Sequence, residues 1–524
     1  MPMKLLPAAR PAAFLAGALA CAIAATGCTS GGSAAPGGPA SSPATNAATG
    51  QAGELHWHSC PIPLAEMRCA SLQVPLDYRH PAGRKITLAV SEMTATAPAA
   101  QQQGYLLVNP GGPGGSGLSL AADVAASLEP SVASEYNIVG FDPRGVGSSV
   151  PALHCDTGFF AGVGPDYIPA NAHAEQVLLA RAKSYAAGCQ RRYGWLLPFM
   201  TTADMARDMD SIRAALGAQK ISYFGYSWGT YLGQVYATLF PHRLRRMALD
   251  SVVNPRGVWY GDNIGQDYAF EGRIRAFFSW IAAHDAVYHL GSTQAQVQQA
   301  WYRARALLEA HPIADPTGPM IGPDEFDDTF QVGGYTDAAW PGLATALAAY
   351  LHRHDTGPMV AVYNALRAQN ENENEFAVYN AVECSDVNWP RSWAKWDADT
   401  RRVYRTAPFL AWDNAWYNAA CAFWPVKGPA QPLQIRGAGL PGILMIQGTL
   451  DAATPYAGAL VARRQLPTAR MVVVLRGGNH GQSLDQPPNT CVDGYLNRYL
   501  ATGALPSSPG LVNAVCPATP LPAG

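Results

Sequence analysis

Short runs typical of β-strands, several ending in glycine turns, alternate with helical stretches in two separate parts of this chain. In the first part the strand-like runs cover residues 86–93, 105–108, 136–141, 221–225 and 247–253. Two further runs, 443–447 and 471–475, lie near the end of the chain. Strands that alternate with helices predict a mostly parallel sheet with helices on both faces, which is an α/β fold.

The stretch between these two parts has a different composition. From about residue 256 to 434 the chain is rich in Trp, Tyr and Ala, and its clearest patterns are helical, over 294–308 and 340–351. We therefore expect a helical cap over 256–434, inserted into one α/β domain. The first part of that domain covers residues 54–255, and the second covers 435–524.

Charge narrows the possible functions. Charged residues make up 14% of the 524 positions and the net charge is -2, so the basic excess of a nucleic-acid-binding protein is missing. Three acidic residues, Glu371, Glu373 and Glu375, alternate with Asn, and we expect them to lie in a solvated loop.

The first 27 residues follow the pattern of an export signal. Lys4 and Arg10 precede an apolar run over residues 12–25, which is too short to cross a bilayer comfortably. The run ends at Ala25-Thr26-Gly27-Cys28, which resembles the lipobox of bacterial lipoproteins. The resemblance implies cleavage before Cys28, lipid on Cys28 and attachment to a membrane by that lipid alone. An ordinary secretory signal with an incidental cysteine is the alternative.

Residues 28–53 would then be the lipidated cysteine and a tether. Positions 29–53 carry no charge and consist almost entirely of Gly, Ala, Ser, Pro and Thr. Such a segment cannot bury enough apolar surface to offset its chain entropy, so we expect it to be flexible.

Export predicts an oxidising compartment, in which cysteines pair. Of the ten cysteines, Cys21 would leave with the signal and Cys28 would carry lipid. The other eight allow 105 connectivities, among which sequence alone does not decide. By position they fall into four local pairs: Cys60 with Cys69, Cys155 with Cys189, Cys384 with Cys421, and Cys491 with Cys516. No CxxC occurs, so we expect no zinc or other metal.

Gly225-Tyr226-Ser227-Trp228-Gly229 fits the G-x-S-x-G pattern of a nucleophile elbow. The pattern alone is weak, but here it follows a strand-like run and opens a helix. This context would hold the hydroxyl of Ser227 clear of the sheet, as a nucleophile requires.

A serine nucleophile needs a base, and the base needs an acid that orients it. Asp451 follows the strand-like run over 443–447, and His480 follows the run over 471–475. Both therefore belong at the carboxyl edge of the predicted sheet, where α/β proteins place their sites. We expect Ser227, Asp451 and His480 to form a catalytic triad.

The reaction also needs donors for a developing oxyanion. We expect the backbone N–H of Trp228 and that of Gly111 or Gly112 to supply them, since Pro113 has no N–H. The same loop fits the dinucleotide pattern G-x-G-x-x-G at 112–117. That reading would leave the three triad elements unexplained, so we expect no cofactor.

Four segments together resemble the secreted tripeptidyl aminopeptidases of actinobacteria, on the proline-iminopeptidase-like branch of the α/β-hydrolases. They are Asn-Pro-Gly-Gly-Pro-Gly-Gly-Ser-Gly at 109–117, Asp-Pro-Arg-Gly-Val-Gly-Ser-Ser at 142–149, Gly-Tyr-Ser-Trp-Gly-Thr at 225–230, and the segment from Asp451 to Pro455. The resemblance implies an α/β-hydrolase fold and a serine exopeptidase that releases short peptides, typically tripeptides, from a free amino terminus. Asn479 departs from the family pattern, which more often has Gly there.

An aminopeptidase must bind an ammonium group, for which an enclosed carboxylate is the natural partner. Glu383 and Asp386 lie in the predicted cap beside Cys384, and related iminopeptidases use cap carboxylates in this way. We expect one of the two to bind the substrate amine.

Two other functions stay open at this point. The same triad would serve a carboxylesterase or lipase, because it also cleaves esters. A catalytically inactive lipoprotein that binds peptides or cell-wall polymer is the second alternative, which fluorophosphonate labelling of Ser227 would test.

Overall fold

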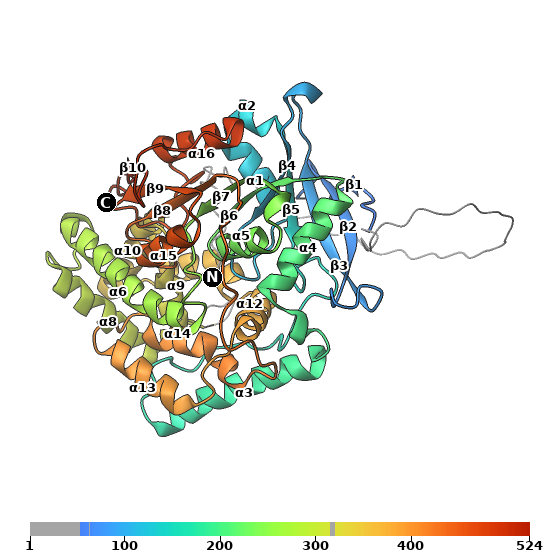
Figure 1. Cartoon of the computed structure of the whole chain (residues 1–524). Coiled ribbons are helices and arrows are strands. Elements are labelled where there is room, and N and C mark those ends of the chain that lie inside the picture. Colours follow the sequence, from blue (N-terminus) through green and yellow to red (C-terminus); the bar gives the residue numbers. More distant parts are fainter. Residues whose placement is uncertain (1–52, 62, 315–319) are drawn as a thin grey trace, which may run out of the picture.

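The computed structural model describes residues 53–61, 63–314 and 320–524 (Figure 1). The expected signal, the expected lipid site at Cys28 and nearly all of the expected tether lie outside these residues. Within the described ranges, no helix is long and apolar enough to cross a membrane.

A single ten-stranded sheet runs through the described chain, in the order β1-β2-β3-β5-β4-β6-β7-β8-β9-β10. Pairing is antiparallel from β1 through β3 to β5 and parallel across the rest, which confirms the expected α/β fold. The strands are β1 (His58–Ser59), β2 (Arg68–Pro75), β3 (Lys85–Met93), β4 (Gly104–Asn109), β5 (Tyr136–Asp142), β6 (Ile221–Tyr226), β7 (Leu244–Asp250), β8 (Ile443–Gly448), β9 (Ala469–Leu475) and β10 (Ala514–Pro517).

Helices cover both faces of this sheet, because successive residues of its central strands point to opposite sides and are buried on both. In β4, Leu107 packs with α4 and α5, whereas Leu106 and Val108 pack with α1 and α16. The helices next to the sheet are α1 (Leu120–Ser127), α2 (Pro130–Ala133), α4 (Thr202–Ala215), α5 (Trp228–Leu239), α15 (Tyr456–Gln465) and α16 (Thr490–Thr502).

Between β7 and β8 the described residues form helices, with a core of their own around Phe277, Trp301, Phe330 and Trp340. These helices are α6 (Tyr260–Ala283), α7 (Asp285–Tyr288), α8 (Gln294–Ala310), α9 (Pro323–Tyr335), α10 (Trp340–Arg353), α11 (Gly357–Asn370), α12 (Glu373–Asp386), α13 (Trp393–Tyr404) and α14 (Ala411–Asn418). The 3-10 helices are η1 (Ala99–Gln101), η2 (Leu197–Phe199), η3 (Pro241–Arg243), η4 (Asp337–Ala339) and η5 (Ala419–Phe423).

One helix from the first part of the chain packs against this helical region. In Figure 1, α3 (Ala172–Tyr193) lies away from the sheet, beside the helices that precede β8. Its Leu178 and Leu179 pack against Trp412 and Trp416 of α14. The helical cap therefore draws on two separate stretches of sequence.

Glu373 contradicts the expected solvated loop at 371–375. It is buried at the start of α12, and its carboxylate accepts hydrogen bonds from the backbone N–H of Cys155 at 2.8 Å and of Asp156 at 3.0 Å. The hydroxyl of Tyr185 donates a further bond at 2.9 Å. The expectation was wrong because three donors from the β5–α3 segment fix this carboxylate inside the protein.

Four disulfides join the cysteines in the four local pairs proposed from their positions. They are Cys60–Cys69, Cys155–Cys189, Cys384–Cys421 and Cys491–Cys516. The third links α12 to η5, close to the site described below.

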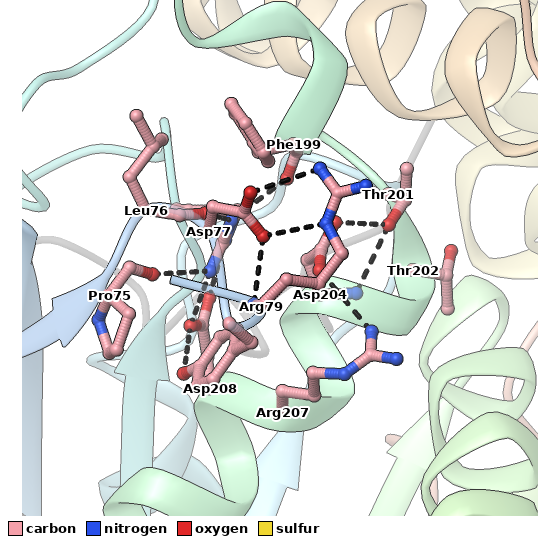
Figure 2. A network of polar contacts seen from close by, with 12 residues as sticks. Pro75, Leu76, Asp77, Arg79, Phe199, Thr201, Thr202, Asp204, Arg207 and Asp208 are labelled. Atoms are coloured by element: carbon pink, nitrogen blue, oxygen red, sulfur yellow. Dashed lines mark hydrogen bonds and ion pairs between the residues drawn. The ribbon is translucent and has the colours of Figure 1, made fainter. Parts of the chain in front are cut away.

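A buried ion pair fastens the loop after β5 to the rest of the core. Arg144, fully buried, donates to both carboxylate oxygens of Asp208 at 2.7 Å and to the carbonyl oxygens of Leu76 and Phe199. Figure 2 shows Leu76, Phe199 and Asp208 of this network beside the ion pair of Asp77 with the exposed Arg79.

We expect Arg144→Met to lower the free energy of unfolding by about 3–5 kcal/mol, because Asp208 would keep a buried charge with no cation beside it and, among the described residues, only the hydrogen bond from Tyr78. Urea unfolding followed by circular dichroism measures this loss. Arg79→Met removes the exposed partner of Asp77 and should cost less than about 1 kcal/mol. Equal losses in the two variants would contradict the role assigned to the buried pair.

Candidate active site

Ser227 is the single residue between strand β6 and helix α5, and its backbone is strained. Its φ of 55° and ψ of -129° lie where a residue with a side chain is rarely found. Neighbouring backbone comes very close, since a Cβ added to Gly111 would lie 2.8 Å from the Cβ of Ser227. Only glycine fits at position 111, where φ is also positive, at 99°.

Asp451 and His480 meet at the carboxyl edge of the sheet. The Nδ1 atom of His480 lies 3.0 Å and 3.1 Å from the two carboxylate oxygens of Asp451. Thr454 donates to the same carboxylate from its N–H and from its hydroxyl, both at 3.0 Å. Asp451 is thus buried, fully hydrogen-bonded and able to fix the orientation of the imidazole.

The other imidazole nitrogen of His480 is available for proton transfer. Its Nε2 atom is buried and has no hydrogen-bond partner among the described residues, Ser227 included. Catalytic hydrogen bonds of this kind often tighten only when substrate is bound. The Tyr335 ring stands edge-on to the imidazole, with the ring centres 5.6 Å apart. The backbone carbonyl oxygen of Tyr335 accepts a hydrogen bond from the backbone N–H of His480.

Asp250, at the end of β7, connects the serine turn to the histidine loop. Its carbonyl oxygen accepts from the N–H of Ser227 at 3.1 Å, and its carboxylate accepts from the N–H groups of Gln482 and Ser483. Burial raises the pKa of Asp250 to about 7. The sequence analysis missed this residue, although an acid at the end of a predicted strand was the available signal.

The expected oxyanion donors differ in availability. The N–H of Gly111 already donates to the Asn109 side chain at 3.0 Å. Gly112 and Trp228 both line the cavity that contains Ser227. Of the two glycines proposed from the sequence, Gly112 is therefore the better placed.

A cavity of about 270 Å³ lies between Ser227 and the cap helices. Its described lining residues include no Lys, Arg or His but four carboxylic acids: Asp262, Asp328, Glu383 and Asp413. A cavity lined in this way favours a cationic ligand over an anionic one.

The two candidate amine-binding residues have different surroundings. Glu383 lines the cavity, is 3% exposed, and accepts a long hydrogen bond of 3.4 Å from Asn263; burial raises its pKa to about 8. Asp386 lies outside the lining and accepts from the N–H and hydroxyl of Thr202 at 2.7 Å and 2.6 Å, and from the Trp259 indole. Asp386 therefore holds core and cap together.

Helices α9 and α14 add acids that the sequence analysis missed. Asp328, Gln331 and Tyr335 recur along one face of α9, and Asp413 and Tyr417 along one face of α14; all five line the cavity. Burial raises the pKa of Asp413 to about 7. Helical spacing was the signal, but it did not show which face meets the serine.

No group of His, Cys, Asp or Glu side chains that could hold a metal ion is found among residues 53–61, 63–314 and 320–524.

The sheet topology, the serine at the β6–α5 turn and the buried Asp–His pair define an enzyme, a serine hydrolase with the α/β-hydrolase fold. More narrowly, the chain is a serine peptidase, and it belongs to the tripeptidyl aminopeptidase family. It is 42% identical to the tripeptidyl aminopeptidase of Streptomyces lividans over 467 residues, which are 86% of this chain and 84% of the relative. Residues 407–516 match the family described as TAP-like protein.

Two more distant relatives come from Mycobacterium tuberculosis strain H37Rv. The chain is 32% identical to the protein named carboxylesterase B, with 87% of this chain and 89% of the relative covered. It is 31% identical to serine protease Hip1, with 84% and 86% covered.

Proposed function

We propose that this protein is an exported serine exopeptidase that releases tripeptides, or other short peptides, from the free amino terminus of peptides. Ser227 attacks the carbonyl carbon of the scissile bond while the Nε2 atom of His480 takes its proton. Asp451 holds the imidazole in the tautomer that leaves Nε2 unprotonated and stabilises the imidazolium that forms.

The rest of the cycle uses the same residues. The N–H groups of Trp228 and Gly112 stabilise the oxyanion, and His480 returns its proton to the departing amine. The acyl-enzyme on Ser227 is then hydrolysed by water that His480 activates. The released short peptide carries the original free amine.

The observation that carries this proposal is the acidic cavity around Ser227. An ammonium group is the cationic group common to all peptide amino termini, and a carboxylate binds it by a charge-assisted hydrogen bond. The test compares Ala-Ala-Ala-p-nitroanilide with its N-acetylated form. The proposal is supported if the tripeptide is released efficiently only from the substrate with a free amine. Equal cleavage of both substrates contradicts it.

A carboxylesterase is the second candidate, favoured by the mycobacterial relative of that name. The same triad and oxyanion donors would act on esters. Cleavage of p-nitrophenyl butyrate without cleavage of the tripeptide anilide would support this candidate.

Export forms part of the proposal. The pattern of residues 1–27 is that of a signal, and Cys28 would carry the lipid anchor. The four disulfides support an oxidising location, where such bonds persist. Fractionation of the native host and mass spectrometry of the mature amino terminus test the anchor.

We expect Glu383→Gln to reduce the preference for free-amine substrates about 10- to 100-fold, because an amide replaces a charge-assisted hydrogen bond worth about 1.5–3 kcal/mol. The measurement is the kcat/KM ratio of the free and N-acetylated tripeptide anilides. Asp386→Asn is the matched control on the same helix, and its effect should fall on thermal stability. An unchanged ratio in Glu383→Gln would remove Glu383 from the amine site.

A further inference from the structure

A second cavity, of about 70 Å³, continues the active-site cavity into the cap. The two cavities share four lining residues, Phe160, Tyr167, Asp328 and Tyr417. The two cavities therefore adjoin at these residues inside the cap.

Helix α9 forms a common wall and gives the depth of the second cavity. Tyr335, at one end, contacts His480, and Asp324, near the other end, lines the second cavity. At 1.5 Å per residue, Asp328 lies about 10 Å and Asp324 about 16 Å along the helix from Tyr335.

These depths match the dimensions of a peptide. Three extended residues span about 10 Å, so the first residue of a tripeptide unit would lie beside Asp328. A lysine side chain at that residue extends about 6 Å further on its four-carbon stem, which brings its ammonium group to the depth of Asp324.

The lining of the second cavity suits a cation. Aromatic rings of Phe159, Phe160, Tyr185, Phe376 and Tyr417 form much of its wall. Arg181 also lines this cavity; its guanidinium lies 4.2 Å over the Phe159 ring and donates to the Phe159 carbonyl oxygen, so this wall already accepts one cation on a ring face.

Asp324 supplies a buried carboxyl group whose pKa is raised to about 9 by burial and by the neighbouring Glu325, so that a cation beside it would favour its charged form. It is 5% exposed, and its Oδ1 atom has no hydrogen-bond partner among the described residues. Its neighbour Glu325 instead accepts from the N–H groups of Gly164 and Gly322, both at 2.8 Å, and so has a structural role. A buried carboxylate oxygen without a partner is costly unless a ligand pairs with it.

We propose that the second cavity is a subsite for an alkylammonium group of the peptide substrate, held by Asp324 and the aromatic wall. The group is either the side chain of a lysine at the first position of a tripeptide unit or the terminal amine of a four-residue unit. This inference rests on the proposed exopeptidase function.

The experiment compares Lys-Ala-Ala-p-nitroanilide with norleucine-Ala-Ala-p-nitroanilide, in which a methyl group replaces the ammonium group. We expect the wild-type enzyme to favour the lysine substrate about tenfold in kcat/KM and Asp324→Asn to bring this ratio close to one. Glu371→Gln is the matched control, since that carboxylate lines the same cavity but is already paired with Arg367 at 2.9 Å. It should keep the wild-type ratio.

A second pair, tetra-alanine and tri-alanine p-nitroanilide, separates the two sources of the ammonium group. If tetra-alanine p-nitroanilide has a higher kcat/KM than the tri-alanine substrate and Asp324→Asn removes this difference, the subsite binds the terminal amine. If the difference between the lysine and norleucine substrates depends on Asp324 instead, the subsite binds the lysine side chain. If Asp324→Asn does not fold, Asp324→Ser carries the same expectation. Ratios that neither variant changes, or wild-type ratios near one in both pairs, overturn the subsite. Failure to cleave any tripeptide anilide would instead contradict the proposed function.

Discussion

Ser227→Ala is expected to lower kcat/KM for a tripeptide anilide by about 10⁴- to 10⁶-fold, since it removes the atom that forms the acyl-enzyme. The residual rate would come from oxyanion stabilisation and binding, which the variant keeps. The variant should unfold at the temperature of the wild type, because alanine and serine have similar constraints at a φ of 55°. Anilide cleavage measures the loss of kcat/KM and the residual rate, and a thermal melt compares the unfolding temperatures. Fluorophosphonate labelling reports whether the reactive hydroxyl has been removed.

Ser222 provides a matched control on β6, the strand that leads to Ser227. Its hydroxyl is buried and has no hydrogen-bond partner among the described residues. Ser222→Ala should keep kcat/KM within about twofold and leave stability unchanged or slightly higher, because it deletes an unsatisfied polar group. Retention of more than a few per cent of activity in Ser227→Ala would exclude Ser227 as the nucleophile.

The triad candidates were predictable because parallel strands impose a simple rule. Ser227, Asp451 and His480 each follow a strand-like run, and the carboxyl ends of parallel strands meet at one edge. The contact between Asp451 and His480 then depends on strand order, which places β8 next to β9. The disulfide pairs were close in sequence, so local grouping was enough to suggest them.

The cap was less predictable, because no comparable rule links its helices. Glu383 and Asp386 are one turn apart on α12, and sequence alone did not show which of them faces Ser227. The assignment depends on Thr202, whose N–H and hydroxyl come from α4 and bind Asp386. The acids of α9 and α14 escaped notice for the same reason.

Local capping signals also misled where a side chain had a stronger partner. Thr201 caps α4 and accepts from the Asp204 N–H, so Asp204, also a common capping residue, lies inside the first turn. Thr454 stands just before α15, where a threonine commonly caps a helix. Its hydroxyl instead donates to the Asp451 carboxylate, and α15 begins at Tyr456 without a side-chain cap. A buried charge near a turn outcompetes an ordinary helix cap.

The contact between Thr454 and Asp451 allows the support of the carboxylate to be tested separately from its charge. Thr454→Val removes one donor to the carboxylate but keeps the side-chain volume and the N–H bond from the same residue. We expect a modest loss of about tenfold in kcat/KM, because Asp451 would still be charged and still bound to His480. The variant therefore separates the loss of a hydrogen bond to Asp451 from the loss of the negative charge on Asp451.

Asp451→Asn should be far more damaging, with a loss of about 10⁴-fold in kcat. The carboxylate accepts from Thr454 and from the Nδ1–H of His480, so all its bonds need acceptor oxygens. The two Thr454 donors bind different oxygens, so an asparagine that keeps its oxygen on the Thr454 N–H turns its NH₂ group toward the Thr454 hydroxyl, which can accept, and toward Nδ1. The imidazole would then carry its proton on Nε2, where it cannot accept one from Ser227. Fluorophosphonate labelling would slow in parallel with anilide cleavage, whereas an asparagine variant with wild-type kcat would show that Asp451 does not orient the base.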